Sequence, residues 1–332
     1  MENKYITLDY GSGGKKTAEL IEKLIVPAFN NDALNQLSDG AVLSGAEKLV
    51  FSTDSFVVNP YFFPGGDIGK LSVCGTVNDI CMAGGDPKYL SLSFIIEEGF
   101  PMEDLERIIE SIRQTAESAG VFVVTGDTKV VEKGKGDGLY INTAGIGFLK
   151  CPGLSEKNIK EGDAVLVSGP VGNHGISVMM ARNPGLLKGN LLSDCAVVKN
   201  EAFSLMQLGS SLKVMRDPTR GGLATTLCEF VEGSGLSIEL SEESIPVSSA
   251  TRAACDILGL DALYCACEGR ITAVVDADWA LEAVKALNEA GASAAIIGTV
   301  GKRYPGRVVL KNAFGGERFL TRLSGSQLPR IC

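Results

Sequence analysis

Four aspartates in the first half of the chain have the neighbours expected of metal or phosphate ligands. Each stands near glycine or small polar residues, close to the end of an expected strand: Asp39, Asp54, Asp79 and Asp127. Hard cations such as Mg²⁺ take oxygen ligands and keep nucleotide phosphates as partners. Any one of these residues alone is better explained as the cap of a turn or helix. The four together, with Asn78 beside Asp79, favour a metal–phosphate site.

Lys129 follows Asp127 by two residues, so a continuing strand places both side chains on one face. A basic residue at this position could contact phosphate or polarise a substrate oxygen. A solvated lysine on an edge strand is the equally weighted alternative.

Three glycine-containing turns could hold ligands. Residues 9–17 (DYGSGGKKT) depart from the Walker phosphate loop at Asp9 and Lys16, so we interpret them as a flexible glycine arm that runs into a helix near Lys16. Residues 168–177 could bind an anion and contain the only histidine, His174, which is more often structural than catalytic. In residues 215–227, Arg220 offers a fork for phosphate or carboxylate, or merely pairs with Asp217 at a helix start.

The nine cysteines are expected to be mostly free thiols in a reducing compartment, many of them in the core. Cys265 and Cys267 lack the second cluster that a zinc site needs, so core thiols are favoured. Glu268 follows them near a strand start, and a buried carboxylate with a raised pKa can act as a general base.

Cys332 differs from the other cysteines because it is the last residue, after Pro329 and Arg330. Its own carboxylate opposes ionisation of the thiol, an effect that Arg330 could partly offset. A sulfur at this position suits presentation to another active site on a swinging tail, and an incidental terminal cysteine is the alternative.

The elements that must position these residues alternate between strands and helices. In the first half we expect strands at 48–58, 89–99, 121–132 and 139–149, and an amphipathic helix at 102–120 that ends at Gly120. In the second half we expect strands at 164–169, 236–241, 269–276, 292–302 and 307–312, and helices near 175–182, 219–235 and 279–291. This order predicts an α/β (α+β layered) fold.

Length and composition indicate the domain organisation and limit the classes of binding partner. A chain of 332 residues is expected to form two domains. We predict an N-terminal arm and helix at 1–36, domains at 37–152 and 153–320, and a mobile tail at 321–332. The net charge of −9 argues against a broad surface for binding nucleic acid. With no secretory signal and no apolar run of about 20 residues, we expect a cytoplasmic protein without a membrane anchor.

In this order and over nearly the whole chain, the motifs resemble those of the HypE family of hydrogenase maturation proteins. This family belongs to the aminoimidazole-ribotide synthetase (PurM-like) superfamily. The matching segments include LSDGAV, FSTDSFVVNP, GTVNDICMAGGDPKYLS, VTGDTKVV, MRDPTRGGLATTL and the terminal PRIC. The wider superfamily shares the segments of the ATP site, whereas the PRIC ending is specific to this family.

The resemblance implies a two-domain PurM-like fold and a homodimer in which the N-terminal sheets join. It implies that ATP and Mg²⁺ bind around the four aspartates and Asn78. The glycine arm would partly cover the nucleotide, with contacts from Gly13, Gly14 and Lys15.

The resemblance also implies a role for the tail. A carbamoyltransferase, HypF, would load a carbamoyl group on Cys332, and ATP-dependent dehydration would convert it to a thiocyanate. Lys129 and Glu268 would lie at the reactive end, with Glu268 as the base. The cyano group would pass to iron held by a HypC–HypD complex, for the NiFe(CN)₂CO centre of hydrogenase.

Two alternatives remain open at this point. One is another ATP-dependent enzyme of the superfamily, such as a ribotide synthetase or a small-molecule kinase, with an irrelevant tail. The other is a non-catalytic carrier or scaffold that uses Cys332.

Overall fold

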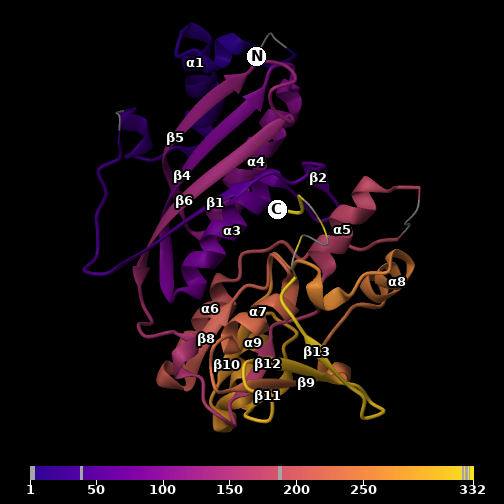
Figure 1. Ribbon diagram of the computed structural model, residues 1–332. Coiled ribbons are helices and arrows are strands. Elements are labelled where there is room, and N and C mark those ends of the chain that lie inside the picture. Colours follow the sequence, from indigo (N-terminus) through magenta and orange to yellow (C-terminus); the bar gives the residue numbers. More distant parts are fainter. Residues whose placement is uncertain (1–3, 38–39, 186–188, 324, 326–327, 329) are drawn as a thin grey trace.

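The first half of the chain forms a four-stranded sheet in the computed structural model, which describes residues 4–37, 40–185, 189–323, 325, 328 and 330–332 (Figure 1). Its strands are β1 (Leu49–Phe56), β4 (Gly85–Glu97), β5 (Phe122–Val131) and β6 (Leu139–Leu149). They lie in the order β1-β6-β4-β5, with β4 and β5 parallel and the other pairs antiparallel. All four strands predicted for this half are confirmed.

One face of this sheet packs on two helices, α3 (Ile68–Met82) and α4 (Met102–Ala119). The amphipathic pattern predicted α4, which ends where Gly120 takes a left-handed conformation with φ of 65°. Sequence patterning did not predict α3. Nearly all of its side chains are buried, so the helix has no solvent-facing polar side and lacks the alternation that marks an amphipathic helix.

The opposite face of the sheet has no helix on it among the described residues. Its strand residues include exposed apolar side chains, with Phe51 68%, Phe122 57% and Ile95 45% accessible to solvent. In the register of the strands, Phe51, Ile146, Tyr89 and Phe122 form one row across this face. A contiguous apolar patch of this kind is typical of a surface that another chain covers.

Short elements precede and connect these strands. The N-terminal segment contains η1 (Leu8–Gly11), α1 (Lys15–Leu20), η2 (Ile21–Ile25) and α2 (Val26–Phe29), and a two-stranded hairpin contains β2 (Phe62–Phe63) and β3 (Gly66–Asp67). The helix predicted near Lys16 is therefore confirmed.

The second half forms a seven-stranded sheet in the order β13-β12-β9-β11-β7-β10-β8, in which only β9 and β12 pair in parallel. Its strands are β7 (Ala164–Val167), β8 (Leu212–Arg216), β9 (Ser237–Ser241), β10 (Thr272–Val275), β11 (Ala295–Gly301), β12 (Arg307–Lys311) and β13 (Glu317–Leu320). The helices of this half are α5 (Asn173–Arg182), α6 (Lys199–Met206), α7 (Gly222–Val231), α8 (Ser249–Leu258) and α9 (Ala280–Glu289).

The predicted strands and helices of this half are present, whereas β8, β13, α6 and α8 were not predicted. Residues 150–163 connect the two sheets along the sequence, and we propose that the domain boundary falls in this segment.

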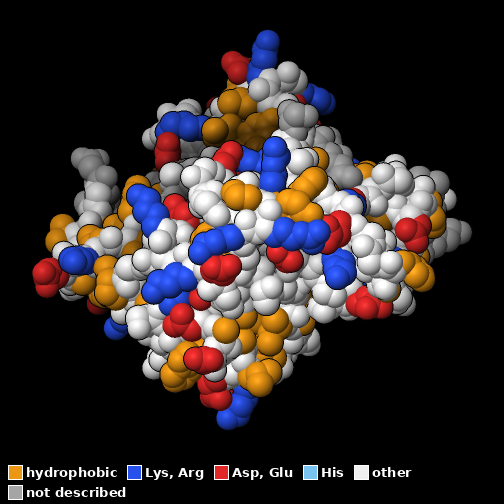
Figure 2. Space-filling view, turned by 60° about the horizontal axis from the view of Figure 1, so that its bottom comes forward, with side chains coloured by type: hydrophobic (Ala, Val, Ile, Leu, Met, Phe, Trp, Pro, Cys, Tyr) orange, Lys and Arg blue, Asp and Glu red, His pale blue; other side chains and the backbone are white. Residues whose placement is uncertain are grey.

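In the described part of the chain, no helix combines the length and apolarity that a membrane span requires. Figure 2 shows basic and acidic side chains interspersed on the face it presents, without a large field of one sign.

The two halves are joined through the buried side chain of Asn78 on α3, which is 1% exposed. Its amide nitrogen donates to the backbone carbonyls of Ala196 at 2.9 Å and Glu268 at 3.3 Å. Its carbonyl oxygen accepts the Val198 N–H at 3.0 Å. Asn78 was predicted to bind the cofactor, but in this structure both ends of its amide are engaged with backbone groups of the second half.

Replacing Asn78 with alanine should therefore destabilise the fold, because it leaves buried backbone groups on the second half without partners. We expect the free energy of unfolding to fall by about 2–4 kcal/mol in urea denaturation. The matched control is Asn200→Ala, which alters an exposed amide on α6 and should change the free energy by less than about 0.5 kcal/mol. Equal effects of the two substitutions would contradict this role.

Candidate active site around the C-terminal cysteine

The last three residues of the chain return to the cleft between the two halves and lie against residues 57–59 (Figure 1). The Val57 N–H donates to the Cys332 carbonyl at 3.2 Å, and the Asn59 N–H donates to the Arg330 carbonyl at 3.4 Å. The Arg330 side chain donates in return to the Val57 carbonyl at 3.1 Å. We predicted a mobile tail. In this structure its last residues are docked by backbone hydrogen bonds to residues 57–59, and no pattern in the nearby sequence predicts these bonds.

Arg330 does not offset the charge near the thiol, contrary to our expectation. Its guanidinium forms an ion pair with Asp137, and its backbone has a left-handed φ of 53°. Arg182 on α5 donates to the Arg330 and Asn59 carbonyls and so bridges the tail to the neighbouring segment. Arg330 thus holds the tail from outside the cavity that receives the sulfur.

The sulfur of Cys332 faces a cavity of about 250 Å³, which we call the tail cavity. Five separate segments contribute to it: β1, α3, the loop between β8 and α7, the loop before β10, and the tail. The lining residues are Thr53, Asp54, Gly75, Asp79, Asp217, Thr219, Arg220, Glu268 and Cys332. Two of the predicted aspartates and two of the predicted catalytic residues therefore meet here.

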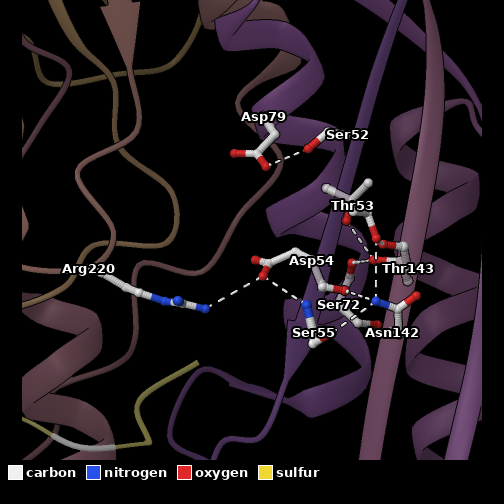
Figure 3. Close-up of polar contacts among 10 residues, drawn as sticks. Ser52, Thr53, Asp54, Ser55, Ser72, Asp79, Asn142, Thr143 and Arg220 are labelled. Carbon is white, nitrogen blue, oxygen red and sulfur yellow. Dashed lines mark hydrogen bonds and ion pairs between the residues drawn. The ribbon is translucent and has the colours of Figure 1, made fainter.

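Three carboxylates in the tail cavity disfavour one another's ionisation. Burial raises the pKa of Asp217 to about 7, and the neighbouring Asp79 adds to that shift. Burial also raises the pKa of Asp79, although the hydrogen bond that the Ser52 hydroxyl donates at 2.7 Å lowers it in part (Figure 3). Burial likewise raises the pKa of Asp54, whose carboxylate accepts the Ser55 N–H. A cation bound here would relieve this repulsion.

Glu268 is the most deeply buried acid of the tail cavity, at 2% exposure. Burial raises its pKa well above the usual range, and Asp217, Asp194 and Asp54 add to the effect. Its Oε1 has no hydrogen-bond partner in the described part of the chain. The Glu268 N–H donates to Asp194 at 2.7 Å, which fixes the backbone of this loop. In its ionised form, a buried carboxylate whose acceptor oxygen has no partner among the described residues can take a proton from a group carried on the neighbouring sulfur.

Arg220 links the sulfur to the carboxylates. Its guanidinium lies 3.7 Å from Asp54 (Figure 3), and a hydrogen bond to Cys332 raises the pKa of the arginine. The turn that presents Arg220 requires glycine, because a Cβ on Gly222 would lie 2.6 Å from the carbonyl oxygens of Leu263 and Cys265. Arg220 therefore contacts Asp54 across the cleft, and does not form the pair with Asp217 that was our alternative explanation.

The Cys332 thiol is held in its protonated form by this environment. Burial raises its pKa to about 11, and the charge of Glu268 adds to that shift, while the hydrogen bond from Arg220 opposes it. The docked sulfur is therefore a poor nucleophile near neutral pH.

Asp127 and Lys129 lie on the other face of the N-terminal sheet. Asp54 on β1 is in register with Thr143 and Leu92 on the face that packs on α3, whereas Asp127 is in register with Ser93 and Asn142 on the uncovered face. One chain therefore does not bring Asp127 together with the tail cavity. The prediction that Lys129 shares a strand face with Asp127 is confirmed, since the two side chains form an ion pair at 2.7 Å.

The glycine arm lies beside β5, away from the tail cavity. A Cβ on Gly11 would lie 2.3 Å from the Val130 nitrogen, so the arm packs directly on this strand. Gly13, with a φ of 77°, and Gly14 lead into α1 at Lys15, and none of these three lines the tail cavity. A second, mainly apolar pocket of about 310 Å³ lies between the helices that follow the arm and β5, with Asp127 on its wall.

The predicted ligand set of four aspartates is not assembled as a metal site in this chain. Asp39 lies outside the described residues, and Asp127 is on the far face of the sheet. Across the described ranges, no three His, Cys, Asp or Glu side chains form a group that could hold a metal ion. Cys265 and Cys267 are buried free thiols, as predicted.

Sequence reasoning left two explanations open for Arg220, a contact to phosphate or carboxylate and a local pair with Asp217, and it did not assign Asp217 to the site. Both stand in one short glycine-rich turn, which was the available signal, but a local ion pair explained them equally well. Asp79 was expected near a strand end and lies instead on α3, whose helical structure was not predicted. Only the packing of α3 against β1 and the second half shows that these side chains share one cavity.

Comparisons with known proteins agree over almost the entire chain. Residues 37–149 match the family described as AIR synthase related protein, N-terminal domain, and residues 160–311 match the corresponding C-terminal domain. The carbamoyl dehydratase HypE of Cupriavidus necator is 45% identical over 98% of this chain and 95% of the relative. That of Escherichia coli is 43% identical over 98% of this chain and 99% of the relative.

Solved structures give the same result. A crystal structure of the hydrogenase maturation protein HypE in complex with ATP has a TM-score of 0.93 and 43% identity, and covers 98% of this chain and 99% of that one. A crystal structure of a HypE–HypF complex has a TM-score of 0.79 and 45% identity, and covers 92% of this chain and 99% of that one. The predicted family and fold class are confirmed.

The electrostatics of the tail cavity predict how Arg220 affects the thiol. Because the guanidinium favours the thiolate, Arg220→Ala should raise the pKa of Cys332 further and slow its alkylation by iodoacetamide several-fold at a fixed pH. The measurement is the pH profile of alkylation, followed by mass spectrometry of the C-terminal peptide. Arg318→Ala, which removes an ion pair with Asp261, is the control and should leave the profile unchanged. A lower pKa in Arg220→Ala would contradict this assignment.

Proposed function

This chain belongs to the HypE family of AIR synthase related proteins, and we propose that it is an ATP-dependent carbamoyl dehydratase that acts on its own C-terminal cysteine. The observation that carries the proposal is the docking of Cys332 beside Glu268, whose buried Oε1 has no partner among the residues that the structure describes. A cavity of about 250 Å³ that already contains the chain's own sulfur leaves room for a small group attached to that sulfur.

The state of the thiol supports loading outside the cavity. The pKa of about 11 keeps the docked sulfur protonated, so it would attack a carbamoyl donor slowly. We propose that the tail leaves the cleft and that a carbamoyltransferase of the HypF type loads the exposed sulfur. The HypE–HypF complex among the structural relatives supports such a partner. The loaded tail then returns as an uncharged thiocarboxamide, which needs no thiolate.

Dehydration follows from the groups that surround the returned tail. The amide oxygen of S–C(=O)–NH₂ attacks the γ-phosphorus of ATP and ADP leaves, which turns a poor leaving group into a phosphate ester. Attack by this oxygen and loss of one N–H proton leave a phosphorylated imidate. Glu268 removes the remaining N–H proton as the C≡N bond forms and phosphate departs with the oxygen. The departing phosphate takes up one of these two protons. The balance is thiocarboxamide plus ATP giving thiocyanate, ADP, phosphate and a proton. Arg220 lies where it can stabilise the negative charge that develops on this oxygen.

We propose that Asp54, Asp79 and Asp217 hold Mg²⁺ together with the phosphates of ATP. The relative in complex with ATP supports a nucleotide site in this fold. The repulsion among these buried carboxylates fits a cation. Mg²⁺ commonly uses one or two carboxylates plus substrate phosphates, so it does not require three preassembled protein ligands. When bound, the ion would neutralise phosphate charge.

We further propose a homodimer in which the uncovered faces of two N-terminal sheets pack together. These faces carry the apolar row of Phe51, Ile146, Tyr89 and Phe122, and β1 and β5 are the edge strands of each sheet. If two copies close face to face, the β5 edge of one lies beside the β1 edge of the other. Asp127, Lys129 and the apolar pocket of one copy would then adjoin the tail cavity of its mate, with the pocket receiving the nucleoside and Lys129 contacting phosphate.

The product suits transfer to a metal. A cyano group on sulfur can pass to iron, and we propose the iron of a HypC–HypD complex in the cytoplasm as its acceptor, for the NiFe(CN)₂CO centre of hydrogenase.

The central prediction concerns the mass of the C-terminal peptide. With a carbamoyltransferase and carbamoyl phosphate, the peptide should gain one carbamoyl group and then lose one water only when ATP is added. Cys332→Ala should do neither and should fail to mature hydrogenase in cells. Maturation by Cys332→Ala, or ATP turnover that is independent of Cys332, would contradict the proposal and favour another enzyme of the superfamily.

Glu268→Gln separates the two half-reactions, because the amide fills the same volume but cannot take the proton. Loading should stay at the wild-type rate, while water loss should slow by about 10²–10⁴-fold in single-turnover measurements. Asp163→Asn, which alters a buried carboxylate outside the tail cavity, is the control. Wild-type dehydration by Glu268→Gln would remove this residue as the base.

Mixed dimers test whether Lys129 acts across the interface. Lys129→Ala and Glu268→Gln should each be inactive alone. Co-expression should restore about a quarter of wild-type dehydration, because half of the dimers then contain one intact site. The absence of restored activity in purified mixed dimers would show that both residues act within one chain.

A further inference from the structure

The only histidine of the chain holds the tail from the side of the second half. His174 lies in the first turn of α5 and is completely buried. Its Nε2 is 2.9 Å from the carbonyl oxygen of Ile331, and its Nδ1 is 2.8 Å from the hydroxyl of Ser193. Ile331 directly precedes Cys332, so the imidazole binds the peptide group next to the reacting residue.

The hydrogen-bond chemistry assigns the proton on this ring. Burial lowers the pKa of His174 to about 4, so the ring is neutral near pH 7 and carries one N–H. The Ile331 carbonyl can only accept, so the proton must be on Nε2. The bare Nδ1 then accepts from the Ser193 hydroxyl, whose oxygen in turn accepts the Cys195 N–H at 3.0 Å. The ring of Phe63 packs edge-on at 5.3 Å and restricts the imidazole to this orientation.

The other contacts of the docked tail cannot replace this one. The pairing with Val57 and Asn59 comes from the first half of the chain and involves backbone groups on the opposite side of the cleft. Arg182 contacts the carbonyl of Arg330, two residues before the sulfur. Among the described residues, His174 is the side chain of the second half that hydrogen-bonds the Ile331 peptide group, and Ile331 itself is only 5% exposed.

We propose that His174 is a positioning residue for dehydration: its Nε2–H holds the Ile331 carbonyl and so sets the depth at which the loaded sulfur sits between Glu268 and Arg220. This inference rests on the function proposed above. Because loading requires the tail to leave the cleft, His174 contributes to water loss and not to carbamoyl transfer.

Two substitutions separate positioning from folding. His174→Phe keeps the aromatic volume and removes the donor, whereas His174→Gln keeps an amide N–H close to the position of Nε2. With the mass assay, we expect His174→Phe to load at the wild-type rate and to dehydrate about tenfold more slowly, the effect of one lost hydrogen bond. His174→Gln should recover most of that loss. Equal dehydration by wild type and a folded His174→Phe would overturn the proposal.

The assay distinguishes failure of this proposal from failure of the proposed function. If the wild-type tail never gains a carbamoyl group and then loses water, the proposed function itself is wrong. If wild type completes both steps and His174→Phe is affected in loading alone, the positioning role is wrong while the function stands.

A second measurement uses the unaltered protein. Because the chain has one histidine, ¹⁵N-histidine labelling yields a single imidazole spectrum. We expect the Nε2–H tautomer with no titration between about pH 5 and 8. We also expect Arg330→Ala, which loosens the docked tail, to shift the Nε2 resonance. An Nδ1–H tautomer, or a ring that titrates near its ordinary pKa, would overturn the assignment even if every substitution impaired folding.

Discussion

The pairing of the chain's last three residues with residues 57–59 is the interaction on which the active site depends. It places a sulfur among buried carboxylates that four distant segments supply, and without it the tail cavity has no group to react. The same pairing explains why the docked thiol is inert. Burial and Glu268 hold its pKa near 11, so the structure favours a carried group over a free nucleophile. From the other half of the chain, His174 and Arg182 on α5 hydrogen-bond the backbone carbonyls of the docked tail.

The four-stranded sheet separates two groups of predicted site residues, one on each of its faces. Asp54 extends toward α3 and the tail cavity, while Asp127 and Lys129 extend from the opposite face at the β5 edge. One chain therefore holds two half-sites that its own sheet keeps apart. The exposed apolar side chains on the uncovered face give a physical reason for two copies to meet there, and our proposed dimer makes one complete site from two halves.

Much of the fold was predictable because its strands and outer helices have simple periodicity. β6 was predicted with its observed bounds, and α4 with its glycine cap. The site was predictable only in part. Glu268 and Cys332 were selected and do meet, whereas Asn78 was assigned to a ligand and instead ties the two halves together. The missed helix α3 carries both Asn78 and Asp79, and a helix that is buried on every side has no alternating pattern to recognise.

The sequence by itself determined the local chemistry: the carboxylates, the terminal thiol, the glycine turns and the strands that carry them. Only the tertiary structure decided which of these groups share a cavity. The face on which a strand residue lies depends on what packs against the sheet, and an irregularity in the pairing of β4 with β5 changes the phase of the alternation before Asp127. The docking of the tail likewise depends on backbone pairing between residues 57 and 332, which leaves no trace in the sequence near either one.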